Sequence, residues 1–450
     1  MALSTFCVRC NPFEGEVHML FNLEVLPAQE GDCLILQWKN KTSEVHTAVI
    51  DGGPGQVYEK SLRPRLEELA GGDKLMLDLV MISHVDNDHI VGVMKMLGAM
   101  SKEIEDGKAP NERMLRIGRL WHNTFNDILG DQLDAYYENE VTASVGGDFG
   151  KLGGKAQKEI AKKLKEKGEK ADEAEHTAED IAAVLAGHGE SRSVRDSYTF
   201  LKGRGAIKYS LNAPFKVNDH PTLIVSPREA IAIEGLNMAI FGPRADEIEA
   251  LQKAFDKYIK DKNLTAEAAL AAYADKSVPN LSSIVALVGL EEGGNRKTIL
   301  LTGDARGDKV LESLEEAGVL GDKPMFVDVL KVPHHGSNRN VDADFFERIH
   351  ANTYVMSANG KYGNPDLPTV RWIVDSRKKS GRYDIVLTYP LKTIDAERKR
   401  VHEKDHPGTP WKAATMALEA YFESKKAEGY KFRVLAGDGD SPVLVKLGDE

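Results

Sequence analysis

Short apolar runs of strand length recur along this sequence, and several of them end in polar residues followed by glycine or a turn. The clearest run, at 77–83, is almost continuously apolar, as in a strand that is buried on both faces. A stretch with helical character follows at 90–100. Strands that alternate with helices indicate an α/β fold. Further strand-like runs lie at 21–26, 33–38, 45–50, 222–225, 284–288, 298–301 and 327–332.

Composition places the chain among ordinary globular proteins. Of its 450 residues, 42% are hydrophobic and 29% charged, which excludes a mainly disordered chain. The formal net charge of −11 excludes bulk attraction to nucleic acid, although a local basic groove or a metal can still meet phosphates. We see no signal peptide and no apolar run of the ~18 residues that span a bilayer. With 3 cysteines, no disulfide framework is expected, and the predicted location is cytoplasmic, without a membrane partner.

The pattern predicts one main domain with additions. We expect an N-terminal extension at 1–18, an α/β domain at 19–390, and a C-terminal helix with closing strands at 391–450. Two helical blocks, at about 126–204 and 244–278, are interpreted as insertions because strand-like runs resume after each.

Some candidate features are better explained without a special function. Residues 151–170 hold 8 Lys and 3 Glu, and we interpret them as a solvated helix face rather than a nucleic-acid contact. The Cys7–Cys10 pair lacks the partners of a zinc site. His122 is interpreted as a hydrogen-bonded structural residue rather than part of a cleft. His402 and His406 are expected on the surface.

The densest group of metal-ligand residues is the segment HVDNDH at 84–89. An extended loop sends residues i and i+2 to the same side, so His84 and Asp86 can bind one ion. Asp88 and His89, at the start of the expected helix, can face a second position. Two histidines and two carboxylates suit a divalent hydrolytic metal.

Three further strand ends carry similar residues. Asp51 follows the run at 45–50, Asp304 follows the run at 298–301, and the His334–His335 pair follows the run at 327–332. Active sites of α/β folds lie at the ends of strands. Four such positions in one chain therefore predict a common site.

The motif series HxDxDH, LTGD and LKVPHHGS resembles that of the metallo-β-lactamase fold. The branch it is most similar to is typified by the metallohydrolase domain of the DNA-uptake competence protein ComEC. The elements at 30–32, 280–283 and 362–365 also resemble that branch. The resemblance implies an αββα sandwich with helical insertions and a metal centre between two sheets.

Site roles follow from the same resemblance. Asp304 matches an aspartate that bridges two metals, and either His334 or His335 matches a late ligand. Asp51 matches a supporting aspartate, and Asn280 a supporting asparagine. Residues that match the signature motif are His84, Asp86, Asp88 and His89.

This chain also departs from the common superfamily signature, HxHxDH. Asp86 replaces the second His, which gives a harder ligand set that favours Mn²⁺ over a tight Zn²⁺ pair. No His is evident between the signature motif and Asp304, where Ser226-Pro227 and Asn280 lie, and Asn364 stands where the branch often has a His. The sequence does not decide whether Asn280 or Asn364 replaces a missing His ligand. We expect one or two divalent ions, Mn²⁺ or Zn²⁺.

The expected activity is hydrolysis by metal-activated water. Asp88 and Asp304 would hold the metals and orient the water, and Lys331 is a candidate stabiliser of the developing anion. A phosphodiesterase or nuclease acting on nucleic acid or nucleotides is favoured. A hydrolase of a small ester, lactone or amide, and a non-catalytic binding module with a decayed metal site, remain alternatives. The sequence does not indicate an oligomeric state.

Overall fold

The computed structural model describes residues 19–39, 44–123, 165, 189–217, 220–221, 223–226, 230–249, 282–379 and 381–448. Outside this described part lie the expected extension at 1–18, Cys7, Cys10, Asn280, most of the two expected insertions, and all of 151–170 except Lys165.

The first sheet has six strands in the order β16-β1-β2-β3-β4-β5. Strands β3, β4 and β5 are parallel, and the pairs from β16 to β3 are antiparallel. Helix α2 connects β4 to β5. The elements are β1 (Phe21–Val25), β2 (Leu34–Lys39), β3 (Val45–Ile50), η1 (Tyr58–Leu62), α1 (Arg63–Ala70), β4 (Leu75–Ile82), α2 (Asn87–Glu105), β5 (Leu115–His122) and β16 (Val443–Lys446).

The second sheet has eight strands in the order β15-β14-β13-β12-β11-β10-β9-β8, with parallel pairs from β11 to β15. Its strands are β8 (Ile231–Ile233), β9 (Leu236–Gly242), β10 (Val285–Glu292), β11 (Asn295–Leu301), β12 (Met325–Lys331), β13 (Ile349–Met356), β14 (Tyr383–Leu387) and β15 (Phe432–Ala436). A separate small sheet pairs β6 (Lys216–Val217) with β7 (His220–Pro221). The predicted α/β class is confirmed.

Helices follow the parallel strands of the second sheet. They are α11 (Gly307–Glu316), η4 (Pro333–Gly336), α12 (Ala343–Arg348), η5 (Lys361–Gly363), α13 (Leu367–Arg377), α14 (Leu391–Asp405), α15 (Ala413–Met416) and α16 (Leu418–Ala427). The C-terminal segment completes both sheets, because β15 pairs with β14 and β16 pairs with β1. None of the helices in the described part of the chain combines the length and apolar character of a membrane span.

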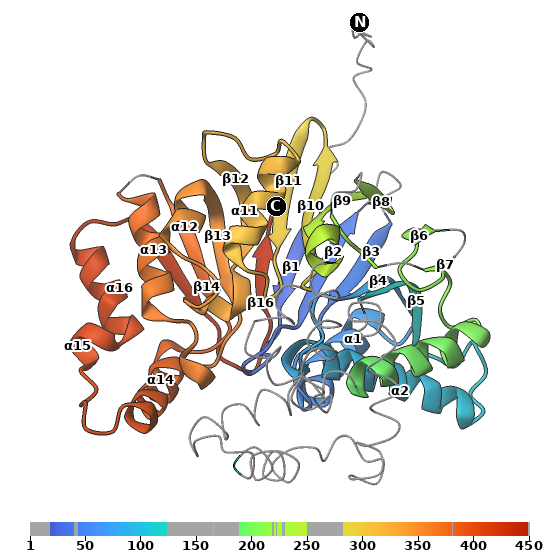
Figure 1. The fold of residues 1–450 in the computed structure, drawn as a ribbon. Helices are drawn as coiled ribbons and strands as arrows, with labels where there is room; N and C mark the ends of the chain where they lie inside the picture. The colour runs from blue at the N-terminus through green and yellow to red at the C-terminus, as the bar shows by residue number, and fades with distance from the viewer. Residues whose placement is uncertain are drawn as a thin grey trace, which may run out of the picture.

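The buried apolar residues form three clusters. One cluster joins residues of both sheets, such as Leu23 and Leu79 of the first and Ile299 and Val355 of the second, so the two sheets pack face to face. The other two clusters lie on the outer faces, against α1 and α2 for the first sheet and against α11, α12, α13 and α16 for the second. Figure 1 shows the helices of the two outer layers on opposite sides of the sheets.

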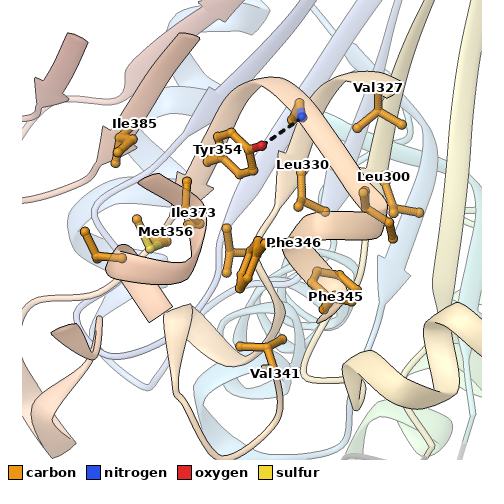
Figure 2. Packing of buried hydrophobic residues seen from close by; sticks show 14 of the residues in the cluster. Leu300, Val327, Leu330, Val341, Phe345, Phe346, Tyr354, Met356, Ile373 and Ile385 are labelled. Carbon is orange, nitrogen blue, oxygen red and sulfur yellow. Dashed lines mark hydrogen bonds between the residues drawn. The ribbon is translucent and has the colours of Figure 1, made fainter. Parts of the chain in front are cut away.

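Aliphatic side chains and a few aromatic rings fill the outer cluster of the second sheet (Figure 2). Phe345 and Phe346 of α12 pack edge to face, with ring centroids 5.2 Å apart. Tyr354 of β13 lies beside Phe346 and accepts a hydrogen bond of 3.1 Å from the backbone of Ala351 through its hydroxyl. This packing holds α12 on the sheet and so fixes the segment between β12 and α12, which carries the His334–His335 pair.

Candidate metal centre

Glycines allow two loops of the first sheet, at Gly31 and at Gly52, to meet the start of α2. A Cβ atom on Gly31 would lie 1.9 Å from the carbonyl oxygen of Asp88, and one on Gly92 would lie 1.8 Å from the carbonyl oxygen of Gly52. The backbone amides of Asp32 and Gly52 donate hydrogen bonds to α2 carbonyls, at 3.1 Å and 2.8 Å. Larger residues would push these loops away from α2, so the glycines fix α2 against the β1–β2 loop and the end of β3.

His89 lies at the middle of the site. It is completely buried, and its Nδ1 lies 3.0 Å from Asp51 Oδ2. The Asp51 carboxylate also accepts hydrogen bonds from the Ser83 amide (2.7 Å) and hydroxyl (2.5 Å). With a proton on Nδ1 held by Asp51, the Nε2 lone pair of His89 faces the second sheet, where Asp304 Oδ1 lies 3.2 Å away.

His335 approaches the same point from the second sheet. Its Nε2 lies 3.3 Å from Asp88 Oδ2 and 3.5 Å from Asp304 Oδ2. Its Nδ1 lies 3.3 Å from Asp32 Oδ1. Asp32 thus lies beside Nδ1 of His335 as Asp51 lies beside Nδ1 of His89, but only the His89–Asp51 contact has hydrogen-bond geometry. The structure brings His89, Asp304 and His335 together with Asp32 as a buried group that could hold a metal ion.

The two neighbouring histidines of η4 have different surroundings. His335 is buried, whereas the His334 side chain is 27% exposed. His334 Nδ1 lies 2.6 Å from Asn340 Oδ1, and its Nε2 lies 3.6 Å from Asp304 Oδ2. Both residues have positive φ angles, 49° and 54°, an uncommon conformation for a residue with a side chain. This strained turn lets adjacent residues present both rings to the site.

Asp32 is the site residue that sequence reasoning missed. It lies between β1 and β2, is 1% exposed, and faces the Nδ1 atoms of His89 and His335 rather than their Nε2 atoms. The sequence signal was the Glu30-Gly31-Asp32 element, which had been interpreted only as part of the resemblance.

Lys331, the expected stabiliser of the developing anion, lies against Asp32, with its Nζ 3.7 Å from Asp304 Oδ1. Its side chain is buried, contacts the Asp32 carboxylate, and donates a 3.0 Å hydrogen bond to the Gly303 carbonyl. Burial opposes the charged form, but Asp32 and Asp304 raise the pKa of Lys331, so the ammonium stays charged. The group neutralises Asp32 inside the protein, and its burial keeps it from reaching a substrate.

His84 and Asp86 form a second part of the site, which is less enclosed on the Asp86 side. Both ring nitrogens of His84 are buried, and burial lowers the pKa of His84 to about 4, which leaves a neutral imidazole. Asp86 Oδ2 lies 3.7 Å from His84 Nδ1, and the Asp86 side chain is 32% exposed. Loss of solvation, reinforced by Asp88, raises the pKa of Asp86 to about 7.

Without an ion, the buried carboxylates of the site are balanced by the rings beside them. Burial opposes the charged imidazoles, but Asp304 and its neighbouring carboxylates hold the pKa of His89 and His335 well above the usual range. Burial opposes ionisation of Asp304, but His335 and His89 hold its pKa well below the usual range. Burial likewise opposes ionisation of Asp88, whose pKa His89 and His335 lower. These carboxylates, with Asp32, lie in a poorly solvated space where charge needs a partner.

The donor set fits a divalent cation. Ligand atoms about 2.1 Å from a tetrahedral ion lie about 3.4 Å apart, close to the separations of 3.2–3.8 Å between His89 Nε2 or His335 Nε2 and the oxygens of Asp88 and Asp304. Among the residues that the structure describes, Nε2 of His84, His89 and His335 and Oδ1 of Asp304 are buried without a hydrogen-bond partner. Buried polar atoms normally have a hydrogen-bond partner, and a bound metal ion would be a common partner for these atoms.

The remaining expected residues lie around this cluster. Asn364 is buried beside η5 and lines the groove described below. Ser283, of the 280–283 element, accepts a 3.2 Å hydrogen bond from the Asp304 amide. His122 is buried at the end of β5, with its Nε2 2.8 Å from Ser191 Oγ.

A groove of about 780 Å³ adjoins the cluster, with Asp88, His334 and His335 in its wall. Its basic lining residues are Arg339, Lys361, Arg371, Arg398, Arg400 and Lys404. Tyr362, 66% exposed, and Trp411 add aromatic rings. His402 and His406, expected simply on the surface, line this groove as well.

Ion pairs already occupy part of this positive charge. Lys361 pairs with Glu30, Arg398 with Asp395, and Arg400 with Glu397. Within the described ranges, neither Arg339 nor Lys404 pairs with a carboxylate, so both are available to an anion.

No protein-family model matches the chain, and no curated protein matches it.

Proposed function

We propose that the chain is a metal-dependent phosphodiesterase of the metallo-β-lactamase fold, related to the ComEC branch, that acts on nucleic acid or nucleotides. Support for the fold comes from the motif order and from two packed sheets with helices on both outer faces. Support for the chemistry comes from the buried His/Asp cluster at the carboxyl ends of β4, β11 and β12.

The observation that carries the substrate class is the groove beside the cluster. A chain with a net charge of −11 gathers six basic side chains and two exposed or partly exposed aromatic rings along one cavity that reaches Asp88 and His335. Phosphate oxygens pair with Lys and Arg, and nucleobases stack on aromatic rings. Arg339 and Lys404, which have no carboxylate partner among the described residues, favour an anionic phosphodiester over a small neutral ester or lactone. Four acidic residues line the same groove: Glu30, Asp88, Asp366 and Asp405.

The position of each residue in the site indicates its role. His89, His335, Asp88 and Asp304 would hold the ion, and His84 and Asp86 would hold a second. Asp51 would keep a proton on Nδ1 of His89, Asp32 lies beside Nδ1 of His335, and Lys331 balances the charge of Asp32. A bound divalent ion would acidify water and neutralise charge that develops on the phosphoryl oxygens. Arg339, beside η4, would position the substrate phosphate.

The test is a hydrolysis screen with the full chain. Bis(p-nitrophenyl) phosphate and a labelled single-stranded oligonucleotide are compared with p-nitrophenyl acetate and a lactone, each with Mn²⁺, Zn²⁺ or Mg²⁺. We expect metal-dependent cleavage of the phosphodiesters, which chelation abolishes. Turnover of the ester or lactone alone would support the small-molecule hydrolase instead. Binding of metal without any turnover would support the binding module.

A further inference from the structure

Tyr362 of η5 combines high exposure with an unfavourable backbone conformation. It lines the groove and is 66% exposed, more than any other large hydrophobic residue in the described part of the chain. Its φ angle is 60°, in the left-handed region that residues with a Cβ atom rarely adopt. A glycine here would remove this cost, so an exposed aromatic ring is held where the backbone favours no side chain. Residues in such conformations cluster at ligand-binding sites, and the Tyr362 ring is therefore a candidate ligand contact.

The turn that carries Tyr362 is attached to both sides of the metal centre. Lys361 pairs with Glu30 in the β1–β2 loop, and its Nζ lies 5.0 Å from the centroid of the Tyr362 ring. On the other side, the backbone amide of Asp366 donates a 3.0 Å hydrogen bond to the carbonyl of Gly336, which ends η4. Both anchors belong to segments that supply residues of the buried His/Asp cluster. The ring is thus fixed in the groove beside that cluster.

Arg398 of α14 supports this turn and a second aromatic ring. Only 8% of Arg398 is exposed, and its Nε donates a 3.1 Å hydrogen bond to the carbonyl of Gly363, the residue after Tyr362. Its Nη1 donates a 2.9 Å hydrogen bond to the carbonyl of Met416, and its Cζ lies 5.6 Å from the centroid of the Trp411 ring. These contacts fix η5 to α14 and to the segment around Trp411. Little ordering of the turn is therefore left to occur when a ligand binds, which favours affinity.

The size of the groove and the exposed ring together select the form of the substrate. A volume of about 780 Å³ is typical of sites that enclose one small ligand, so the groove suits a short single strand rather than a duplex tract. Single-stranded nucleic acid presents base faces that stack on aromatic side chains whatever the sequence. In a duplex the bases are already stacked on each other, and exposing one of them requires unstacking it.

We propose that Tyr362 is the residue on which a base of the substrate stacks, and that this substrate is single-stranded nucleic acid. The phosphate that follows the stacked base would lie toward Arg339 and the cluster, which line the same groove. This inference rests on the proposed function and narrows its substrate class.

Binding measured by fluorescence anisotropy, with metal-free full-length protein at one fixed salt concentration, tests the stacking role. The probes are a labelled single-stranded oligonucleotide, an abasic oligonucleotide of the same length and charge, and the duplex of the first. Tyr362→Ala should raise Kd for the single strand at least about 5-fold, the lower end of what one stacked base contributes. It should leave Kd for the abasic strand and for the duplex unchanged, because neither offers a free base face.

Two control variants isolate the ring and its position. Tyr362→Phe keeps the ring and should bind all three probes like wild type. Phe326→Ala removes an aromatic ring that is 54% exposed at the amino end of β12, and it should also bind like wild type. Circular dichroism establishes that each variant is folded.

The outcomes separate this inference from the proposed function. An unchanged Kd in Tyr362→Ala, or an equal loss for the single strand and the abasic strand, would overturn the stacking role. An equal loss for the duplex would overturn the preference for single strands. No binding of any probe by wild type would overturn the inference even if a model phosphodiester is hydrolysed. Base-dependent binding that Tyr362→Ala removes would support the inference even if no metal ion produces hydrolysis, a result that contradicts the proposed activity alone.

Discussion

The inner and outer parts of the candidate centre are supported differently. In the inner part, His89 and His335 each have a carboxylate on Nδ1, Asp51 at 3.0 Å and Asp32 at 3.3 Å, and both rings are buried. In the outer part, His84 has only Asp86 at 3.7 Å, and the Asp86 side chain is 32% exposed. Carboxylates behind ligating histidines fix ring orientation and raise ligand basicity. The inner position should therefore bind metal more tightly and exchange it more slowly.

Removing the Asp304 charge from the inner part should have the largest effect. Asp304→Asn keeps the volume but removes a carboxylate that faces both His89 and His335. We expect folding without metal to be unchanged or slightly improved, because a buried charge is gone. Metal-induced stabilisation should disappear, and hydrolysis should fall by at least about two orders of magnitude. Melting temperature with and without Mn²⁺, together with turnover of a model phosphodiester, measures both. Near-wild-type turnover would show that Asp304 is only a turn residue.

A comparison of the adjacent residues His334 and His335 tests which of them binds the inner ion. His335→Gln should abolish tight binding of the inner ion, because Nε2 of His335 faces both Asp88 and Asp304. His334→Gln should reduce Mn²⁺ affinity by less than about 10-fold, because His334 lies at the groove edge and 27% of its side chain is exposed. Mn²⁺ titration of the two variants measures the contrast. Equal losses would mean that the two rings share the ligand role.

Substitutions of the two supporting carboxylates, Asp51 and Asp32, should have different effects on metal affinity and on fold stability. Asp51→Asn should weaken Mn²⁺ binding about 10–100-fold. Asp32→Asn should do the same and also destabilise the fold by about 3–5 kcal/mol, because it leaves the buried Lys331 ammonium without its partner. The double change Asp32→Asn with Lys331→Met should recover much of that stability but not the metal affinity. Urea unfolding and Mn²⁺ titration provide the two readouts, and an unrecovered stability would argue against the Asp32–Lys331 pair as the cause.

The smallest effects are expected in the groove, away from both metal positions. Arg339→Ala and Lys404→Ala should raise KM for a single-stranded oligonucleotide while leaving Mn²⁺ affinity unchanged. Each lost phosphate contact should reduce the log–log salt slope of binding by about 0.7. Glu419→Ala on α16, a change of charge that is not among the groove-lining residues, serves as the control. A KM that is insensitive to both groove changes would contradict the assignment of the groove to the substrate.

The sequence predicted the parts of the site that follow a clear strand. The apolar run at 77–83 with its HVDNDH segment and the runs before Asp304 and His334 indicated both the α/β class and where polar residues would meet. It could not choose between His334 and His335, because the choice depends on backbone turns with φ angles of 49° and 54°. Asp32 was missed because its partners, Lys331 and His335, lie about 300 residues away and meet it only when the sheets pack.

The central claim is that the His89, His335, Asp88 and Asp304 side chains hold a divalent ion. Anomalous diffraction at the manganese edge, from crystals grown with Mn²⁺, tests it most directly. The account predicts a peak within about 2.0–2.3 Å of His89 Nε2, His335 Nε2 and an Asp304 oxygen. A second, weaker peak is predicted beside His84 and Asp86. Peaks confined to surface carboxylates, with none between His89 and His335, would contradict the account.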